Sequence, residues 1–320
     1  MRNHEPRTTA CVDLSVCSGV LIVDKPTGMS SGYACRKVSR HFGLKKAGHL
    51  GTLDPLATGV LPLCINEGTR LAQFLMHADK EYEATMRLGS VTDTQDSQGQ
   101  VLSQADSLPD SQEEIREVCS RFQGEQLQLP PMYSALKRNG QPLYKLARRG
   151  ETIERQPRPV TIHALEISAI EMPDVTMRVC CSSGTYVRTL CHDIGQALGC
   201  GAHLSALRRT RCGYFEIDAA LQLETALTLE ADMVPGQSFV AMRETLQDMP
   251  EIMLSAELER KVCNGVALCG SDLLSLCHEA LPAGSLVKLI ARDGRLLSIG
   301  SSSGSGSNDA TLRPVRVFAH

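Results

Sequence analysis

Apolar and polar side chains alternate without interruption between Lys80 and Gly89. The apolar face of this segment consists of Tyr82, Ala84, Met86 and Leu88. A period of two residues is that of an extended chain, whose side chains point alternately to opposite faces of a sheet. The segment is therefore predicted to be a half-buried β-strand, and a second alternating segment, Asp174 to Ser182, is predicted to be another.

Helices are predicted at three other places. Ser30 or Ser31 can cap the first helix, which continues through Phe42 and ends before a glycine. Ser111 can begin a second helix of about three turns through a capping box. The third helix is predicted over Thr185 to Leu198.

The order of these elements indicates the fold class. The apolar run from Gly19 to Asp24 is predicted to be a buried strand, and Gly43 to Gly59 is predicted to be a loop. Strands and helices follow one another without the regular alternation of a doubly wound fold, and no glycine-rich nucleotide loop follows a strand. We expect an α+β fold with a largely antiparallel sheet.

The chain is long enough for one large domain and one small one, since its 320 residues exceed a typical domain. After Pro250 the pattern changes to short candidate strands, which are Leu286 to Ile290, Arg295 to Ile299 and Arg313 to Phe318. Residues 251–320 are therefore predicted to form a small β domain. Gly300 to Ser307 is rich in glycine and serine and is predicted to be a flexible loop.

Charge is unevenly distributed, although the formal net charge is only −3. Acidic residues are absent from three windows that carry many Lys and Arg residues, namely Lys25 to Leu53, Gln126 to Gly150 and Ile194 to Phe215. If these windows meet in space, they form a phosphate-binding stripe. Otherwise they are three separate solvated surfaces, and the pattern alone leaves both interpretations open.

Cysteine usage and hydropathy bear on the compartment. The thirteen cysteines show no zinc-ligand spacing, which favours free thiols in a reducing environment. Residues 1–18 lack the apolar core of a signal peptide, and no apolar run approaches the length of a membrane span. A cytoplasmic protein with no membrane association is expected.

The window from Ala47 to Pro62 contains three glycines and two prolines around one carboxylate, Asp54. The ring of Pro55 restricts the preceding residue to an extended conformation, which fixes the direction of that carboxylate. An Asp-Pro pair is usually a simple turn, so the window alone does not decide between a structural and a chemical role.

Six blocks of sequence, in order, resemble the TruB family of pseudouridine synthases. They are Gly19 to Ser31 (GVLIVDKPTGMSS), Gly48 to Pro62 (GHLGTLDPLATGVLP), Asp79 to Gly89 (DKEYEATMRLG), Pro130 to Gly150 (PPMYSALKRNGQPLYKLARRG), Ser182 to Leu190 (SSGTYVRTL) and Gly201 to Arg209 (GAHLSALRR). The resemblance implies the pseudouridine-synthase fold, with a long mixed sheet flanked by helices over residues 19–250. It also implies isomerisation of uridine at position 55 in the TΨC loop of tRNA.

The same resemblance assigns roles to single residues. Asp54 matches the catalytic aspartate of the family, which needs neither cofactor nor metal for a reaction without net redox change. Arg188 matches the arginine that would keep this carboxylate ionised, and a guanidinium can do so through two parallel hydrogen bonds. Tyr82 matches the platform for the flipped uracil, although its pattern alone indicates a core residue.

Further positions match the uridine pocket and the RNA grip. Tyr186 and Leu207 match pocket residues, and His49 matches the histidine that supports base extrusion. The insertion at about residues 125–152 matches the one that grips the RNA arm in bacterial members of the family. Its expected RNA contacts are Tyr133, Lys137, Arg148 and Arg149, and those expected elsewhere are Lys25, Arg208 and Arg209. Lys25 can instead brace the turn that follows it.

Residues 251–320 resemble the small RNA-binding PUA domain only loosely, and residues 1–18 lie outside the resemblance as an N-terminal extension. The expected partner is the TΨC arm of tRNA, bound by a monomer without guide RNA. Two alternatives are a non-catalytic RNA-binding protein and a guide-dependent synthase of the archaeal and eukaryotic kind. The insertion favours the stand-alone enzyme over the latter.

Two other motifs are discounted. Consecutive residues on a helix point about 100° apart, so Cys191, His192 and Asp193 cannot form a hydrolase site. The segment with Asp93 and Asp96 lacks the ligand pattern of a calcium loop and is predicted to be a polar turn.

Overall fold

The computed structural model describes residues 10–138, 140–269, 271–274, 282–303 and 311–318. Eleven strands form one large sheet, whose main path is β15-β2-β4-β13-β5-β12-β11-β8. The strands of the main path are β15 (Leu221–Gln222), β2 (Gly19–Lys25), β4 (Thr58–Ile65), β13 (Ala202–Cys212), β5 (Lys80–Leu88), β12 (Asp174–Cys181), β11 (Arg158–Glu171) and β8 (Gly124–Gln128). Three more strands pair at its sides and are β3 (Ala47–His49), β14 (Phe215–Glu216) and β17 (Phe239–Ala241).

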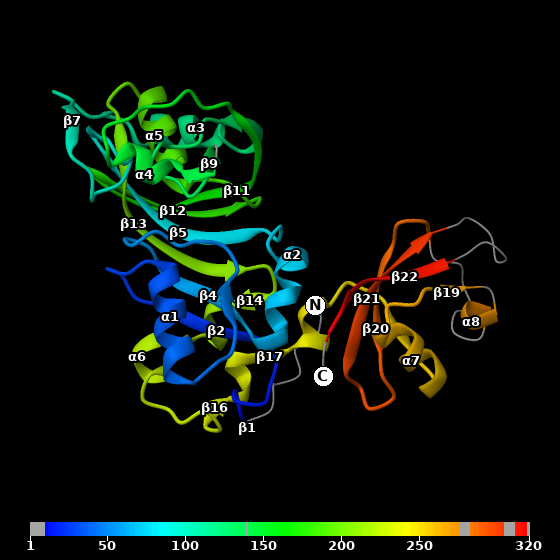
Figure 1. The fold of residues 1–320 in the computed structure, drawn as a ribbon. Coiled ribbons are helices and arrows are strands. Elements are labelled where there is room, and N and C mark those ends of the chain that lie inside the picture. The colour runs from blue at the N-terminus through cyan, green and yellow to red at the C-terminus, as the bar shows by residue number, and fades with distance from the viewer. Residues whose placement is uncertain (1–9, 139, 270, 275–281, 304–310, 319–320) are drawn as a thin grey trace.

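The sheet is mixed and largely antiparallel, as expected. Its parallel pairs are β13 with β4 and β15 with β2. Figure 1 shows two lobes along the sheet, one carrying α1 and α6 and the other α3, α4 and α5. The helices of this part are α1 (Ser31–His41), α2 (Ala72–Leu75), α3 (Gln112–Ser120), α4 (Leu143–Ala147), α5 (Val187–Ala197) and α6 (Leu223–Ala226).

Strand β2 is buried on both of its faces. Leu21 and Val23 pack in the core that includes side chains of α1 and α5, whereas Val20 and Ile22 pack in a second core on the opposite face. All four side chains have no exposed surface. A strand buried on both faces has a continuous apolar sequence rather than an alternating one, which explains the run at Gly19 to Asp24.

Several short strands and 3-10 turns also belong to this unit. They are the pairs β1 (Cys11–Val12) with β16 (Val234–Pro235), β6 (Ser90–Thr92) with β7 (Val101–Gln104) and β9 (Lys137–Arg138) with β10 (Gln141–Pro142), and the 3-10 turns η1 (Asn66–Leu71), η2 (Ile217–Ala219), η3 (Gly236–Ser238) and η4 (Met242–Thr245). Part of the predicted N-terminal extension is thus packed on the large unit, since Leu14 is fully buried in its core.

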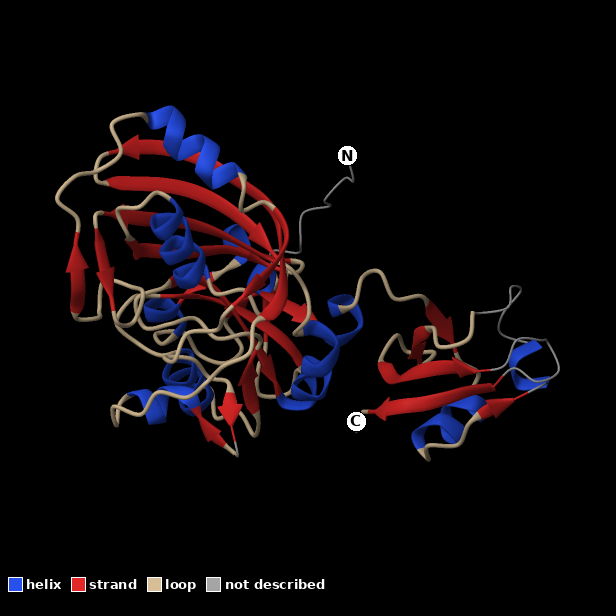
Figure 2. Cartoon of the chain, turned by 90° about the horizontal axis from the view of Figure 1, so that it is seen from above, coloured by secondary structure: helices blue, strands red, loops and turns tan. Residues whose placement is uncertain are grey.

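A five-stranded sheet follows, in the order β18-β20-β21-β22-β19. Its elements are β18 (Glu251–Met253), α7 (Ala256–Cys263), β19 (Leu268–Cys269), α8 (Ser271–Leu274), β20 (Leu286–Ile290), β21 (Leu296–Ser303) and β22 (Thr311–Val317). Figure 2 shows this unit beside the large one, joined by a single connection. The predicted small β domain after Pro250 is therefore present.

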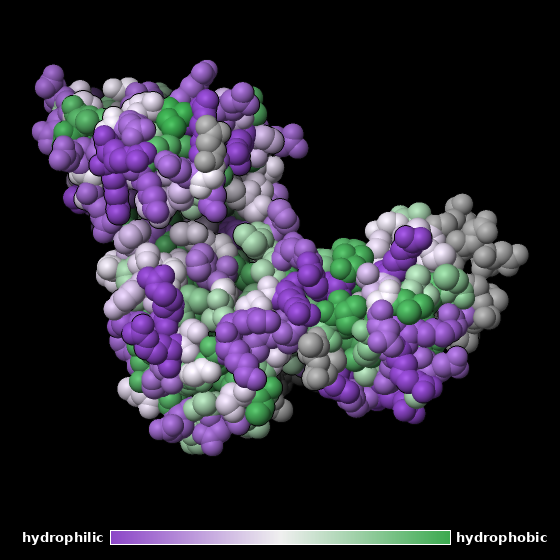
Figure 3. Space-filling model, viewed as in Figure 1, coloured by the Kyte–Doolittle hydropathy of each residue, from purple (hydrophilic) through white to green (hydrophobic). Residues whose placement is uncertain are grey.

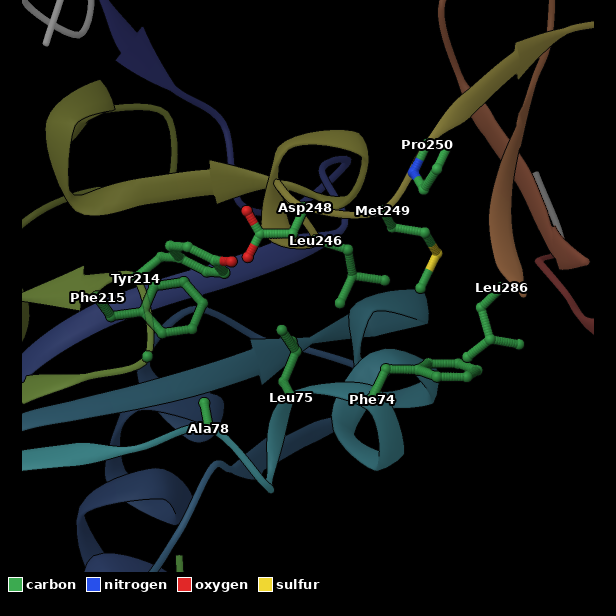
Figure 4. A pocket seen from close by; sticks show the side chains of 11 residues that line it. Phe74, Leu75, Ala78, Tyr214, Phe215, Leu246, Asp248, Met249, Pro250 and Leu286 are labelled. Atoms are coloured by element: carbon green, nitrogen blue, oxygen red, sulfur yellow. The ribbon is translucent and has the colours of Figure 1, made fainter. Parts of the chain in front are cut away.

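The two units meet at an apolar pocket of about 380 Å³. Phe74 and Leu75 line it from α2, Tyr214 from the turn before β14, Met249 from the linker and Leu286 from β20 (Figure 4). Apolar side chains of the small unit also gather next to the large one in the space-filling view (Figure 3). The second core of the large unit extends into the small one, which fixes the two together.

Most predicted elements are confirmed, but two loops were wrong in part. The segment Gly43 to Gly59 contains β3 and the start of β4. Strand β21 continues through Ser303, so only the later part of the predicted flexible loop, residues 304–307, lies outside the described residues. Serines 301 to 303 pair with β22, because small polar side chains do not prevent backbone pairing.

Candidate active site

The loop that carries Asp54 is held from both sides. The Ser31 hydroxyl accepts a hydrogen bond from the backbone N–H of Leu53 (2.7 Å) and donates to the Leu53 carbonyl oxygen (2.9 Å). On the other side, the N–H of Gly28 donates to the carbonyl oxygen of Pro55 (2.8 Å). Ser30, not Ser31, caps α1, so the choice left open by the sequence is settled and Ser31 is free to anchor the loop.

Arg188 lies opposite Asp54, in the first turn of α5. Its side chain is only 4% exposed, and its Nε lies 2.9 Å from Oδ2 of Asp54. The other two nitrogens donate to backbone carbonyl oxygens, Nη1 to Thr94 (3.1 Å) and Nη2 to Tyr133 (2.8 Å). The guanidinium therefore contacts the carboxylate through one nitrogen, rather than through the two parallel hydrogen bonds considered from the sequence.

The polar turn at Asp93 and Asp96 supports the arginine. Asp96 accepts hydrogen bonds from the Thr94 hydroxyl (2.6 Å) and the Gln98 N–H (3.0 Å), and its Oδ2 lies 3.8 Å from Nη1 of Arg188. The turn was predicted correctly, but its proximity to Arg188 was not. Asp96 and Arg188 are more than 90 residues apart in the sequence, and no sequence pattern indicated that they lie close together.

Burial and charge act in opposite directions on Asp54. Burial raises the pKa of its carboxyl, Arg188 and Lys25 lower it, and Asp96 raises it, with a net rise above the ordinary value of 3.8. Its side chain is 36% exposed, on the side that opens to a pocket. The acid is thus reachable and incompletely solvated, which is the state of many catalytic carboxyls.

The pocket next to Asp54 has a volume of about 330 Å³. It is lined by Tyr82, Tyr186, Arg188 and Leu207 together with the aspartate. These are five of the six predicted catalytic and substrate-binding residues, brought together from separate strands, loops and helices. A pocket of this size accommodates a ligand such as a nucleoside.

The two tyrosines differ in their surroundings. Tyr82 is 8% exposed on β5, and burial raises the pKa of its phenol to about 12. Tyr186 is half-buried immediately before α5, and burial raises the pKa of its phenol as well. Both phenols are therefore neutral near pH 7 and present apolar ring surface to the pocket.

His49 is the sixth predicted residue and does not line the pocket. It lies half-buried on β3, where it pairs with Leu63 of β4. Burial lowers the pKa of its imidazole, and the nearby Arg209 lowers it further. A neutral imidazole is expected near pH 7.

Two predicted RNA contacts do not fit the structure. Lys25 is fully buried and donates from Nζ to the carbonyl oxygens of Pro26 (2.8 Å) and Met29 (2.9 Å), so it braces the turn. Arg209 is 1% exposed and donates to the carbonyl oxygens of Val60 (2.7 Å) and Gly51 (3.3 Å). Neither side chain is available to a surface phosphate, because both are buried and donate to backbone carbonyl oxygens.

The remaining predicted RNA contacts are accessible. Lys137, Arg148 and Arg149 are exposed on the insertion, and Tyr133 is half-buried. Arg208 is half-buried and forms an ion pair with Asp24, with Nη2 2.7 Å from Oδ2. All three basic windows contribute to the pocket lining, for example through Thr52, Ala135 and Leu207, so they converge in space.

Lys80 is a pocket residue that was missed from the sequence. Its Nζ donates to the carbonyl oxygens of Met76 (2.9 Å) and Ala78, and its side chain is buried. The signal was present, because strand alternation places Lys80 on the same face as Tyr82. A lysine on the otherwise apolar face of a strand requires a buried partner.

Two family models match the chain. Residues 39–187 match the TruB family pseudouridylate synthase (N terminal domain), and residues 188–253 match the tRNA pseudouridylate synthase B C-terminal domain. The tRNA pseudouridine synthase B of Burkholderia pseudomallei (strain 668) is 48% identical over 304 residues, which cover 93% of this chain and 96% of the relative. That of Geobacter sulfurreducens is 42% identical and covers 94% of this chain and 99% of the relative.

Solved structures give the same fold. A chain of the Cbf5-Nop10-Gar1 complex is 28% identical with a TM-score of 0.70, over 94% of this chain and 85% of that one. A chain of an H/ACA RNP bound to a substrate RNA containing 2'-deoxyuridine is 25% identical with a TM-score of 0.71, over 99% of this chain and 92% of that one. In the part of the chain that the structure describes, no helix is both long and apolar enough to cross a bilayer.

Proposed function

Because the chain belongs to the TruB family of pseudouridine synthases, isomerases that modify uridine in tRNA, we propose that it acts at position 55 in the TΨC loop and uses Asp54 for catalysis. The observation that carries the proposal is the Asp54–Arg188 ion pair beside a pocket lined by two tyrosines. The reaction takes place in the cytoplasm.

The chemistry requires a carboxylate next to the target nucleotide. Isomerisation breaks the bond between C1' of the ribose and N1 of uracil, rotates the base, and joins C5 to C1'. A carboxylate can act in this reaction as nucleophile or base, and neither role needs a cofactor or a metal. Arg188 favours the charged form of Asp54 and so opposes the effect of burial on its pKa.

The pocket holds the extruded uracil. An enzyme that acts on a base within folded RNA must remove it from the stack and bind it by stacking and apolar contact. Tyr82 supplies the platform, and Tyr186 and Leu207 complete the lining. His49 lies outside the pocket, where its neutral ring supports the vacated stack.

The insertion grips the RNA arm. The phosphate contacts on it are made by Lys137, Arg148 and Arg149, and Tyr133 contributes a stacking surface. Arg208, which is also paired with Asp24, adds a further RNA contact. Residues 251–320 add a PUA-like surface for the same RNA. The protein acts as a monomer without guide RNA.

A non-catalytic RNA-binding protein is the alternative. It would have no need for a carboxylate of raised pKa beside a pocket, because a buried acid repels phosphate and costs stability. The guide-dependent alternative is less favoured, because identity to the tRNA pseudouridine synthase B of Burkholderia pseudomallei is 48% and identity to the matching chain of the Cbf5-Nop10-Gar1 complex is 28%.

Tritium release tests the reaction and its site together. The purified protein is incubated with a tRNA transcript carrying 5-tritiated uridine, beside a transcript in which the target uridine of the TΨC loop is replaced by cytidine. Release from the first transcript alone is expected. Release from neither, with RNA binding intact, would support the non-catalytic alternative, and equal release from both would move the target to another uridine.

The RNA contacts are tested by the salt dependence of binding. Replacing Lys137, Arg148 and Arg149 with Ala together should reduce the slope of log Kd against log salt by up to about 3. An unchanged slope would show that the insertion does not contact phosphate. Replacing Arg116, an exposed arginine of α3, is the control.

A further inference from the structure

Gln128 is a buried amide at the end of β8, just before the part of the insertion that follows the sheet. Its side chain is 2% exposed, and both of its polar atoms are used. Oε1 accepts a hydrogen bond from the backbone N–H of Tyr186 (2.8 Å), and Nε2 donates to the carbonyl oxygen of Tyr186 (3.1 Å). The side chain therefore binds one residue's backbone as a neighbouring strand would.

Tyr186, the residue whose backbone Gln128 binds, lies at the start of α5, the helix that carries Arg188. Tyr186 is the N-cap of α5, with extended backbone, and no side chain of its own caps the helix. Its carbonyl oxygen also accepts the N–H of Leu190 (3.0 Å). Because the first N–H groups of a helix lack partners within it, an outside group that bonds the N-cap fixes where the helix begins. The Tyr186 ring and the Arg188 guanidinium both project from this turn.

The same insertion contacts the site a second time. The carbonyl oxygen of Tyr133 accepts from Nη2 of Arg188, and Arg155 at the far side of the insertion donates to the carbonyl oxygen of Pro130 (2.9 Å). The base of the insertion is thus joined to the start of α5 at two points, five residues apart in sequence. A displacement of this part of the insertion would therefore move Tyr186 and Arg188 together.

We propose that Gln128 is a positioning residue for the isomerisation, which couples the base of the RNA-gripping insertion to the Asp54–Arg188 pair through the N-cap of α5. The inference rests on the proposed function. Gln128 does not line the pocket, so it acts through Tyr186 and Arg188 rather than on the uridine itself. A displacement of about 1 Å in such a group can lower turnover by about 100-fold.

Gln128→Met removes both hydrogen bonds at nearly constant side-chain volume. Gln126→Met is the matched control, because Gln126 lies two residues earlier on β8, half-buried, and its Nε2 donates to the carbonyl oxygen of Phe122 (2.7 Å) rather than to α5. For Gln128→Met, kcat in tritium release should fall by about 10- to 100-fold, while KM and the Kd for tRNA stay within about twofold. Gln126→Met should behave as the unaltered protein does.

A second readout does not depend on turnover. The pKa of Asp54 can be followed in the free protein by carbon NMR of labelled aspartate carboxyls, with the resonance assigned by its loss in Asp54→Asn. The charged groups that face this carboxyl are Arg188 on α5, Asp96 in the polar turn and Lys25 on β2, and Lys80 and Arg209 also line the pocket. Displacing Arg188 removes its lowering effect, so the pKa of Asp54 should rise in Gln128→Met but not in Gln126→Met.

The outcomes separate the inference from the proposed function. A lower melting temperature with unchanged Asp54 titration and unchanged kcat would make Gln128 merely structural and overturn the inference. If the pKa of Asp54 is shifted in Gln128→Met but the unaltered protein releases no tritium, then Gln128 does position Arg188, and it is the proposed isomerisation that is rejected. A moved titration together with lowered kcat at unchanged KM supports both.

Discussion

Two carboxylates in this molecule pair with arginine at similar exposure, yet their pKa values move in opposite directions. Glu251, where the large unit joins the small one, has a side chain that is 31% exposed and a pKa lowered from 4.5 to about 2. Its Oε2 lies 2.6 Å from Nη2 of Arg243, and its Oε1 lies 2.8 Å from Nζ of Lys288. Asp54 is 36% exposed and its pKa is raised.

The two pKa values differ first because burial is the largest influence on Asp54 and raises its pKa, whereas the hydrogen bond from Arg243 is the largest influence on Glu251 and lowers its pKa. The use that each cation makes of its nitrogens adds to this difference. Arg243 gives Glu251 two nitrogens, and Lys288 adds a third charged donor. Arg188 gives Asp54 one nitrogen and uses the others on the carbonyl oxygens of Thr94 and Tyr133. Glu251 is satisfied and joins two units, whereas the charge of Asp54 remains incompletely stabilised, as its raised pKa indicates. A functional site of this kind is expected to cost stability that the rest of the fold supplies.

The largest expected effect comes from removing the carboxylate of Asp54, the proposed catalytic group. Asp54→Asn should lower kcat in tritium release by at least about 1,000-fold, because an amide cannot serve as nucleophile or base. The Kd for tRNA should stay within about threefold, since the proposed phosphate contacts lie on the insertion. Turnover near that of the unaltered protein would remove Asp54 from the chemistry and leave it a turn residue.

The next effect tests whether the geometry of the cation matters beyond its charge. Arg188→Lys keeps one positive charge but loses the fork that reaches Thr94 and Tyr133, so kcat should fall by about 100-fold at unchanged Kd for tRNA. Single-turnover tritium release measures it. Arg178→Lys, at an exposed arginine paired with Glu81, is the control and should have no effect. Equal rates for both variants would mean that Asp54 needs only a nearby charge.

The sequence predicted strands best where alternation is unbroken. Strands β5 and β12 follow the two predicted alternating segments closely. Strand β11, with 14 residues, was missed, and so was β13. Both contain register shifts, at Ile162/Ala164 and Ile167/Ala169 in β11 and at Leu204/Ala206 in β13, and each bulge interrupts the two-residue period that identifies a strand.

The candidate site was predicted through its motifs, and its supports were not. Asp54, Tyr82 and Arg188 occur in recognisable blocks, and the structure brings them together. The groups that hold them in place are largely backbone atoms, such as the carbonyl oxygens of Thr94 and Tyr133, which every residue possesses. No residue pattern marks a carbonyl as an acceptor, so these contacts require the fold.

A smaller effect is expected at the junction of the two units. Glu251→Gln removes the charge that Arg243 and Lys288 share, and should lower the free energy of unfolding by about 1 kcal/mol after allowing for solvent screening. The melting temperature should fall by about 1–2 °C with kcat nearly unchanged. Glu257→Gln is the control, because Glu257 is 73% exposed and lies 4.0 Å from Lys261. Equal melting temperatures for the two variants would show that the junction ion pairs contribute nothing measurable.

The smallest effect is the pH dependence of stability, which should have opposite signs at the two carboxylates. A lowered pKa in the folded state adds stability above the unfolded value, and this is lost as the pH falls from about 4.5 to about 2. The stability lost in Glu251→Gln should therefore shrink over that range.

The raised pKa of Asp54 has the reverse effect, because the folded state holds the proton of this carboxyl more tightly than the unfolded state does. Ionised Asp54 therefore costs stability at neutral pH. Asp54→Asn should accordingly be the more stable protein at pH 7, and its advantage should vanish as the pH falls toward 3.8. Thermal unfolding of the three proteins across this range measures both trends, and trends of the same sign would show that the two carboxylates are held alike.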